Sequence, residues 1–266
     1  MSRSDRRDWQ LPPGVVPGTW EYIASRDIAD DYDEYFAIHP MFDLDEAVLQ
    51  RWFTTPGVLI DFGCGTGRAL MPFARQNFRC VALDLSLPML HVVGEKAEMD
   101  GLEIDRVCAN LVDLDCLADN WADYACCLFS TLGMIDGAEN RLAALRGIRK
   151  TLKNKGIFVL HVHNAWHHLR YRQGRRRFLR DLPNRLLPGR VSTFGDRTYA
   201  YRGLPRMFLH AFSKRELTNL LHQASFTIEE TIPLGLPKEN RHEPLSRPWL
   251  FPRLRAYGWI VVCRTR

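Results

Sequence analysis

A glycine-rich turn carries the residues of this chain whose types and spacing point most directly to chemistry. The apolar run Val58–Ile60 leads through Asp61 into Phe-Gly-Cys-Gly-Thr-Gly at 62–67, and a helical pattern starts at Arg68. Glycines lack a Cβ atom and adopt positive φ at little cost, so a ligand can approach such a backbone closely. The amides at a helix start add hydrogen-bond donors and a positive dipole end. The turn therefore predicts a small-molecule site at the end of a strand.

Two aspartates indicate what this turn binds. Asp61 stands two residues before Gly63, and Asp84 closes the next apolar run. An acidic side chain at the end of a second strand can accept hydrogen bonds from both ribose hydroxyls of a nucleoside. A dinucleotide cofactor needs a third glycine where Arg68 stands, so a nicotinamide or flavin fits poorly and an oxidoreductase is disfavoured. A carboxylate at position 61 suits a cationic amino-acid moiety, which S-adenosylmethionine carries.

These motifs resemble those of class I S-adenosylmethionine-dependent methyltransferases over residues 45–165, and more weakly over 213–264. The resemblance implies an enzyme that transfers the methyl group of S-adenosylmethionine, its cofactor. It places the methionine part at the turn, the ribose on Asp84 and the adenine beyond it. The cofactor-binding residues that it implies are Asp61, Gly63, Cys64, Gly65, Thr66, Gly67, Asp84, Leu85, Met89, Asn110, Leu111, Phe129 and Ser130. Asn110 stands where family members often carry an acid; its amide oxygen can accept the same hydrogen bond, with Asp113 as a competitor.

The acceptor side offers histidines. Methyl transfer from a sulfonium mainly needs alignment of donor and acceptor, so a general base is optional. The fifth apolar run ends in His161-Val162-His163, at the edge where ligands bind in open α/β sheets. A histidine there can deprotonate an acceptor, and His163 is the candidate catalytic base. His161 and His163 share a strand face, but without a nearby carboxylate they indicate no metal site.

An arginine-rich segment follows. Arg170–Arg190 contains eight arginines and a single acid, Asp181. Such a segment can bind the phosphate or carboxylate groups of an anionic substrate, an RNA backbone or an anionic membrane. Leucines interleave with the arginines, so a solvated helix face over a small apolar seam is an equally good interpretation.

The pattern of apolar runs predicts an α/β fold. Strands are expected near 57–62, 78–84, 103–108, 123–129 and 156–163, and helices near 67–77, 87–99 and 138–153. Strands that alternate with helices pair in parallel through right-handed crossovers. A helix near 213–224 and strands near 226–232 and 256–263 complete the pattern. The resemblance implies a Rossmann-like, doubly wound and mostly parallel sheet of seven strands in the order 3-2-1-4-5-7-6, with the last strand antiparallel.

The remaining segments are expected to surround this sheet. Residues 1–18 predict a disordered tail, and residues 19–54 an N-terminal helical lid of two helices separated near His39-Pro40. Residues 55–266 form the methyltransferase domain, with a substrate-cap insertion at about 164–211 that contains a hairpin at 196–211. Aromatic residues of the lid and of the hairpin are expected to enclose the acceptor. Pro72 predicts a kink in the helix at 67–77.

The whole chain sets the remaining expectations. With 46% apolar and 25% charged residues among 266, it is composed like an ordinary globular protein. The charged N-terminus precedes no apolar segment, and no run approaches the roughly 20 residues that span a bilayer, so a cytoplasmic protein without an integral membrane segment is expected. The favoured function is methylation of a small molecule. The alternatives are an RNA methyltransferase that uses Arg170–Arg190, or a cofactor-binding module without turnover.

Overall fold

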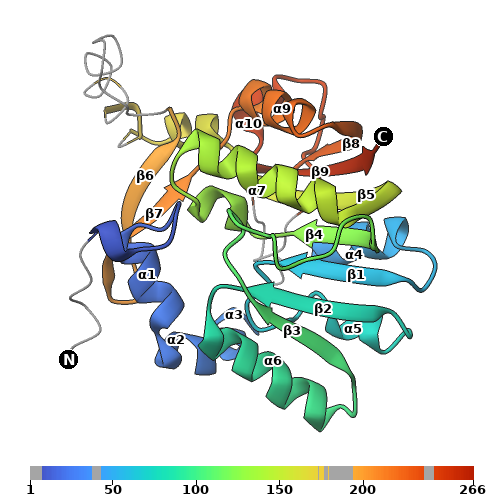
Figure 1. The fold of residues 1–266 in the computed structure, drawn as a ribbon. Helices are drawn as coiled ribbons and strands as arrows, with labels where there is room; N and C mark the ends of the chain where they lie inside the picture. Colours follow the sequence, from blue (N-terminus) through green and yellow to red (C-terminus); the bar gives the residue numbers. More distant parts are fainter. Residues whose placement is uncertain (1–7, 38–42, 173, 177–178, 180–193, 237–242) are drawn as a thin grey trace.

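A seven-stranded sheet forms the centre of the computed structural model, which describes residues 8–37, 43–172, 174–176, 179, 194–236 and 243–266 (Figure 1). Its strands are β1 (Val58–Phe62), β2 (Arg79–Asp84), β3 (Ile104–Cys108), β4 (Ala122–Cys127), β5 (Leu152–His163), β8 (Phe226–Pro233) and β9 (Gly258–Thr265). They lie in the order β3-β2-β1-β4-β5-β9-β8. Strands β1 to β5 pair in parallel, whereas β9 runs antiparallel to both β5 and β8. The predicted strand order and the antiparallel last strand are confirmed.

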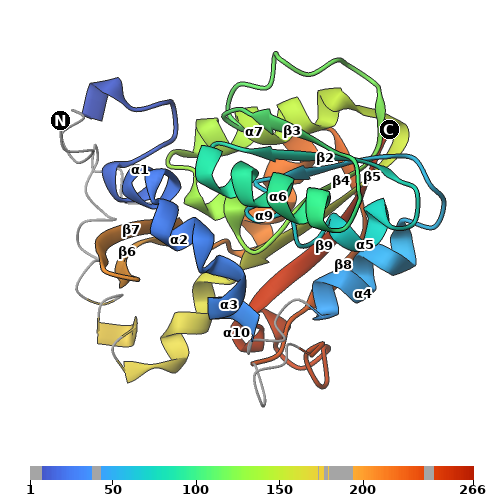
Figure 2. The ribbon, with the colours of Figure 1, turned by 90° about the horizontal axis from the view of Figure 1, so that it is seen from below.

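Helices cover both faces of this sheet (Figures 1 and 2). One face carries α4 (Asp43–Trp52), α5 (Met71–Ala74) and α6 (Leu87–Met99), and the other carries α7 (Ala138–Thr151) and α9 (Lys214–Gln223). Leu49 of α4 and Val93 of α6 belong to the apolar cluster of the first face. Leu145 of α7 and Leu221 of α9 belong to the cluster of the second face. Burial on both faces explains why the central strands are continuously apolar in sequence.

The remaining elements gather beyond the carboxyl ends of the parallel strands (Figure 1). They include the short N-terminal elements η1 (Asp8–Gln10), α1 (Pro17–Ala24), α2 (Arg26–Asp30) and α3 (Tyr32–Ala37), and the hairpin of β6 (Asp196–Tyr201) and β7 (Leu204–His210). Helix α1 packs along β7. The short elements η3 (Thr131–Met134), η4 (Ala165–Arg170) and α10 (Pro252–Arg255) connect this layer to the sheet. We call α1 to α3 together with the hairpin the lid.

Regular structure begins earlier than the sequence predicts. A 3-10 helix occupies Asp8–Gln10 and α1 begins at Pro17, whereas order was expected from Thr19. The segment between them docks on the domain, because the Gly14 carbonyl accepts a hydrogen bond of 2.8 Å from the amide of Asp136. Residues 19–37 form three short helices instead of one. Residues 1–7 and the expected break at His39-Pro40 lie outside the described residues.

The helix predicted at 67–77 is much shorter than expected. Helix α5 covers only Met71–Ala74, because the chain adopts left-handed conformations on both sides of it, with φ of 74° at Gly67 and 63° at Asn77. Pro72 lies in the first turn of α5, where a missing amide costs no hydrogen bond. The predicted kink at Pro72 is therefore wrong.

A glycine-to-alanine pair tests the packing beneath the turn. A Cβ atom at Gly67 would lie 2.9 Å from Val93 Cγ2, whereas one at Gly101, with φ of 64°, would meet nothing within 4 Å. Both alanine variants bear the left-handed cost of about 1 to 2 kcal/mol. We expect Gly67→Ala to lower the free energy of unfolding, measured in urea, by clearly more than Gly101→Ala. Equal losses would contradict the contact with α6.

Candidate functional site

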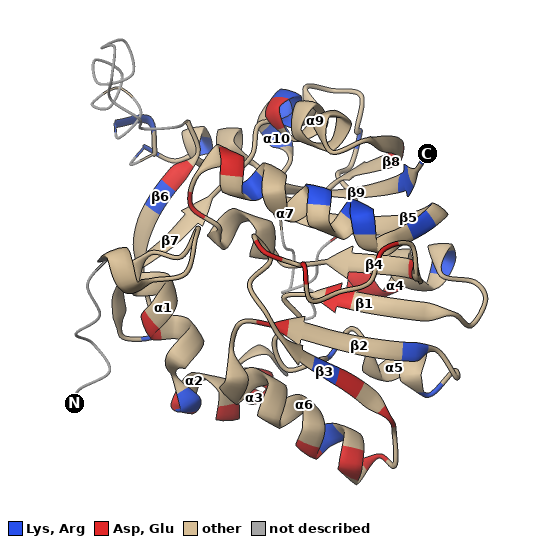
Figure 3. Ribbon diagram, viewed as in Figure 1, with Lys and Arg blue, Asp and Glu red and all other residues tan. Residues whose placement is uncertain are grey.

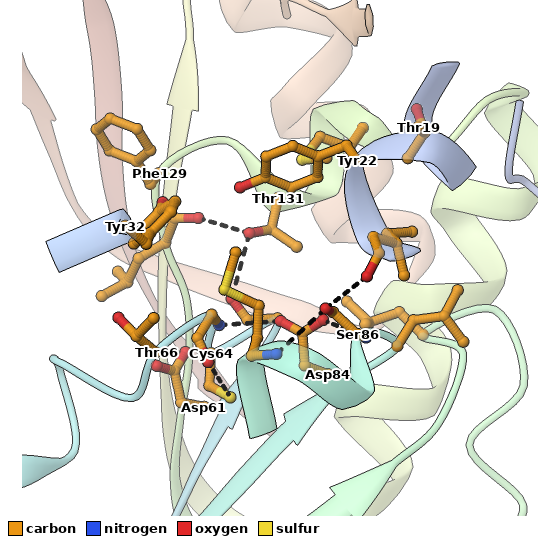
Figure 4. Close-up of a pocket in the computed structure, with 18 of the residues that line it drawn as sticks. Thr19, Tyr22, Tyr32, Asp61, Cys64, Thr66, Asp84, Ser86, Phe129 and Thr131 are labelled. Carbon is orange, nitrogen blue, oxygen red and sulfur yellow. Dashed lines mark hydrogen bonds between the residues drawn. The ribbon is translucent and has the colours of Figure 1, made fainter. Parts of the chain in front are cut away.

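A cavity of about 400 Å³ lies between the lid and the carboxyl ends of β1, β2 and β4. Figure 4 shows side chains from the strand ends and from the lid pointing into it. Most of the predicted site residues line this cavity, namely Asp61, Gly63, Cys64, Gly65, Thr66, Asp84, Leu85, Met89, Asn110, Leu111, Phe129 and His163. Gly67 and Ser130 do not line it. A volume of this size is typical of small-molecule sites.

The glycine turn is shaped for close approach. Gly65 has φ of 52°, and a Cβ atom there would meet only the Tyr32 ring, at 4.0 Å, so this position faces open space. The amides of Gly63 and Cys64 donate to the Leu83 carbonyl at 2.7 and 3.1 Å, and the Gly65 amide donates to Asp84 Oδ2 at 2.9 Å. The amides of Gly63, Cys64 and Gly65 are thus bonded within the protein, which differs from the expectation that the amides of the turn face a ligand. These three amides hold the turn against β2 instead.

Asp84 is held at the end of β2 by backbone donors. Its Oδ2 accepts from Gly65 and its Oδ1 accepts from the amide of Ser86, at 2.8 Å. Burial raises the pKa of Asp84, and the hydrogen bonds from Ser86 and Gly65 oppose that shift. Each carboxylate oxygen has a second lone pair, so this fixed carboxylate can still accept hydrogen bonds from a pair of hydroxyls.

Asp61, near the end of β1, is a buried acid without a countercharge at its Oδ1 atom. The side chain is 3% exposed, and Oδ1 has no hydrogen-bond partner among the described residues. Desolvation, reinforced by the charges of Asp84 and Asp45, raises its pKa to about 7, although a hydrogen bond from Cys126 lowers it. A buried carboxyl group in this position is stabilised in its charged form by a cation that enters the cavity.

The walls of the nucleoside end come from the segments after β2 and β3. Met89 and Leu111 are buried, and both line the cavity together with Leu85. Asn110 Oδ1 accepts from the amide of Val112 at 3.1 Å, and its Nδ2 donates to the Pro13 carbonyl at 2.9 Å. Asn110 therefore joins the N-terminal segment to this wall, and its oxygen keeps one lone pair for a further donor.

Two successive left-handed residues follow β4. Phe129 and Ser130 have φ of 52° and 67°, a conformation that costs energy for residues with a side chain. Ser130 is fully buried: its amide donates to the His161 carbonyl at 2.9 Å, and its Oγ accepts from the His163 amide at 3.0 Å. The polar groups of Ser130, which was predicted to contact the cofactor, anchor the turn on β5, and this residue does not line the cavity. Phe129 is thereby turned into the cavity (Figure 4).

The two histidines of β5 have different surroundings. His163 lines the cavity, and its Nε2 lies 3.3 Å from the Tyr257 hydroxyl. His161 is buried, and its Nδ1 lies 2.9 Å from Asp45 Oδ2 on α4. The carboxylate partner that the sequence does not show near these histidines thus comes from the N-terminal part of the chain. No group of three potential metal ligands occurs within the described ranges.

The comparisons with known proteins agree with this geometry. Residues 59–156 match the family model of a methyltransferase domain. The cypemycin N-terminal methyltransferase of a Streptomyces species is 33% identical over 102 residues, which are 38% of this chain and 40% of that protein. The match spans 43% and 40% of the lengths of the two curated relatives.

Two solved structures share the fold over nearly the whole of their chains. A SAM-dependent methyltransferase from Methanosarcina mazei superposes with a TM-score of 0.65 at 16% identity, covering 82% of this chain and 96% of that one. The 1,6-didemethyltoxoflavin-N1-methyltransferase of Burkholderia thailandensis, solved with its substrate and S-adenosylhomocysteine, gives 0.60 at 19% identity, covering 96% and 92%. Residues 59–156 thus match a methyltransferase domain, and the chain shares the fold of these solved methyltransferases. The predicted resemblance to S-adenosylmethionine-dependent enzymes is thereby confirmed.

Asp33 of α3 ties the lid to the glycine turn. Asp33 Oδ1 accepts from Thr66 Oγ1 at 2.6 Å, and Oδ2 accepts from Lys96 Nζ at 2.6 Å. Lys96, on α6, also donates to the Thr66 carbonyl at 2.9 Å. Sequence patterns give no signal for this contact, because its three members lie on separate elements.

Aromatic side chains of the lid form much of the cavity wall. Tyr22 of α1 and Tyr35 of α3 lie with ring centroids 6.0 and 6.3 Å from that of Tyr201 on β6. Burial raises the pKa of Tyr32 to about 12. Tyr199 and Tyr201 of the hairpin line the cavity, whereas His210 lies outside it, bonded to Asp196 and Glu216 at 2.6 and 2.8 Å.

The arginine-rich segment is only partly described. Four arginines of this segment do not line the cavity, namely Arg170, Arg172, Arg175 and Arg176. The other four, Arg177, Arg180, Arg185 and Arg190, lie outside the described residues.

Figure 3 shows basic residues on the outer helix α7 and acidic residues on β1 and at the end of β2. Among the helices described, none combines the length and the apolar character that crossing a bilayer requires.

The pKa of Asp61 predicts a pH-dependent stability. The folded protein keeps a proton on Asp61 up to about pH 7, whereas an unfolded carboxyl group with its ordinary value of 3.8 has lost it. The contribution of Asp61 to stability therefore falls as the pH rises from about 4 to 7, by an amount on the order of a few kcal/mol. We expect Asp61→Asn to gain stability relative to the wild type over this range, measured by urea unfolding. A stability difference that stays constant with pH would contradict the burial of this acid.

Proposed function

We propose that this chain transfers the methyl group of S-adenosylmethionine to a small-molecule acceptor. The observation that carries the proposal is the pair Asp61 and Asp84 on neighbouring strand ends, with the open face of Gly65 between them. A buried acid whose Oδ1 atom has no hydrogen-bond partner among the described residues suits the ammonium group of the methionine part. A carboxylate fixed by two amides suits two ribose hydroxyls. The residues present therefore fit the cofactor.

Each part of the cofactor has residues to hold it. Asp61 would bind the ammonium group, the turn at 63–66 the methionine chain, and Asp84 the ribose. The adenine ring would lie between Leu85, Met89 and Leu111, with Asn110 Oδ1 accepting from its amino group. When bound, the cofactor supplies a methyl group on a positively charged sulfur, which leaves as a neutral thioether.

The protein's contribution to the reaction is alignment, exclusion of water and removal of a proton. Phe129 and the lid tyrosines enclose the end of the cavity where β4 and β5 finish. His163 borders this end and accepts the acceptor's proton at Nε2. The Tyr257 hydroxyl, 3.3 Å from this nitrogen, can then receive the proton. Exclusion of water by the lid strengthens these interactions and protects the sulfonium.

A small acceptor is favoured over RNA. Residues of the lid line the cavity, and the four described arginines of the basic segment do not border it. The structural neighbour from Burkholderia thailandensis is named for a small heterocyclic acceptor, and its fold matches nearly the whole of this chain. No comparable observation supports RNA.

Calorimetry with S-adenosylhomocysteine tests the cofactor site. We expect saturable binding to the wild type and a weakening of at least about tenfold in Asp84→Ala, because hydrogen bonds to a charged group are lost. Asp113→Ala removes an exposed carboxylate outside the cavity and serves as the control, with unchanged affinity. Absence of saturable heat with both S-adenosylmethionine and S-adenosylhomocysteine would overturn the proposed function.

Transfer of radiolabelled methyl groups to a panel of small amines, alcohols, carboxylic acids and total RNA tests the reaction. We expect transfer to a small molecule, with turnover about 100-fold lower in His163→Asn. The exposed His222 on α9 provides the control variant His222→Asn, with unchanged turnover. His163→Asn should leave the affinity for S-adenosylhomocysteine unchanged. Transfer to RNA alone would contradict a small-molecule acceptor, and full turnover by His163→Asn would contradict the role of His163 as the base.

A further inference from the structure

The cavity has an acceptor end built from aromatic rings. Tyr35 and Phe36 of α3 lie with ring centroids 4.9 Å apart, and Phe36 lies 5.5 Å from Phe129. Phe129 lies 6.4 Å from His163, and Tyr35 lies 6.3 Å from Tyr201. All five side chains line the cavity. We call Tyr35, Phe36, Phe129 and Tyr201 the aromatic wall.

Carboxylates dominate the charges that border the cavity. Among the described residues that line it, Asp45, Glu46, Asp61 and Asp84 are acidic, and Arg68 is basic. Asp61 and Asp84 are assigned to the cofactor in the proposed function. Asp45 and the exposed Glu46, both on α4, have no part in that assignment. The lining therefore has more negative charge than the cofactor contacts use.

Asp45 is the more informative of these two acids. It is 2% exposed, and its Oδ2 lies 2.9 Å from His161 Nδ1. Its Oδ1 has no hydrogen-bond partner within the described part of the chain. A buried carboxylate oxygen left in this state is unfavourable unless a cation or a donor enters beside it. Asp45 lines the cavity, so a molecule bound there can supply that group.

The contacts of His161 place Asp45 next to the acceptor end. The His161 ring lies 6.3 Å from the ring of Phe129 and 6.2 Å from that of His163. Phe129 belongs to the aromatic wall, and His163 is the base of the proposed function. The carboxylate that His161 holds in place is thus adjacent to both groups that border the acceptor.

We propose that the methyl acceptor is a small amine that binds as an ammonium ion, with its charge held by Asp45 and by the aromatic wall. Ammonium groups are attracted to a carboxylate and to the faces of aromatic rings, and Asp45, Phe36 and Phe129 supply both at this end of the cavity. One face of Tyr35 is already covered by the Arg202 guanidinium, 4.6 Å from the ring centroid. The proposal rests on the proposed function and adds a substrate class to it. It replaces the expectation of an anionic substrate. That expectation rested on the arginine-rich segment, and the arginines of this segment that the structure describes do not border the cavity.

The chemistry balances with the residues at hand. An ammonium nitrogen has no lone pair, so His163 first takes one of its protons. The amine nitrogen then forms a bond to the methyl carbon, and the bond between that carbon and the sulfur breaks with its electron pair kept by the sulfur. The products are an N-methylated ammonium ion, S-adenosylhomocysteine and a protonated His163, which releases its proton to solvent.

Three compounds of matched shape and different charge test this inference: phenethylamine, phenethyl alcohol and phenylacetate. Each is titrated into the full-length protein saturated with S-adenosylhomocysteine, and binding is measured by calorimetry and by thermal stabilisation. We expect the amine to bind and to stabilise the protein, and the alcohol and the carboxylate to bind at least about tenfold more weakly. This comparison uses the unmodified protein and so does not depend on how any variant folds.

A pair of variants on α4 assigns the charge. We expect Asp45→Asn to weaken the binding of phenethylamine about tenfold or more and to leave the affinity for S-adenosylhomocysteine unchanged. Asp43→Asn removes an exposed carboxylate two residues away on the same helix and should change neither affinity. Retained affinity for S-adenosylhomocysteine also shows that each variant is folded.

Several outcomes overturn the inference. They are a preference for phenylacetate, no binding of phenethylamine to the saturated protein, and unchanged amine affinity in Asp45→Asn. Loss of S-adenosylhomocysteine affinity alone in Asp45→Asn would assign this residue to the cofactor and would also overturn it. A wild-type protein that fails to bind S-adenosylhomocysteine contradicts the proposed function itself, and this result is recognised before any amine is added.

Discussion

The attachment of the glycine turn to the end of β2 is the constraint on which the site depends. Two amides of the turn donate to the Leu83 carbonyl, and a third donates to the side chain of Asp84. These bonds use three of the amide donors of the turn. They fix the distance between the ends of β1 and β2, and therefore the positions of Asp61 and Asp84 relative to each other. The turn contributes space and position, and the two acids contribute the charge.

The lid is joined to this constraint through polar contacts at separate points. Asp33 binds both Thr66 in the turn and Lys96 on α6, and Ser86, directly after Asp84 and Leu85, donates to the Ile23 carbonyl at 2.7 Å. Each contact uses a residue of the glycine turn or a residue close to Asp84. The arrangement of the lid is therefore set by the same residues that shape the cofactor site. A substitution in the glycine turn or at Asp84 is therefore expected to alter the position of the lid, and with it the aromatic wall.

The fold and the cofactor side of the site were predictable because their signals are local in the sequence. The alternation of apolar runs with helices indicates parallel strands, and Asp61, Gly65 and Asp84 lie at strand ends that the pattern locates directly. Periodicity did not predict the short length of α5. The left-handed residues Gly67 and Asn77 limit this helix, and neither belongs to its apolar pattern. The sequence could not show that the hydroxyl group of Ser130 turns toward β5, because this contact depends on the tertiary structure.

Asp33 and Asp45 were missed because their partners lie far away in sequence, at Lys96 and His161. For Asp45 a faint signal does exist. It shares the apolar face of α4 with Val48 and Leu49, and all three are buried. A carboxylate on the buried face of an amphipathic helix is unusual enough to mark a functional candidate. No equivalent signal exists for Asp33.

One continuous stretch of chain borders both ends of the cavity. The Pro13 carbonyl meets Asn110 at the nucleoside end, and Tyr35, on the third of the short helices that follow, stands at the acceptor end. The nucleoside end and the acceptor end of the cavity therefore share this one stretch as a common wall. A change of position in this stretch would alter the shape of the cavity at both ends together.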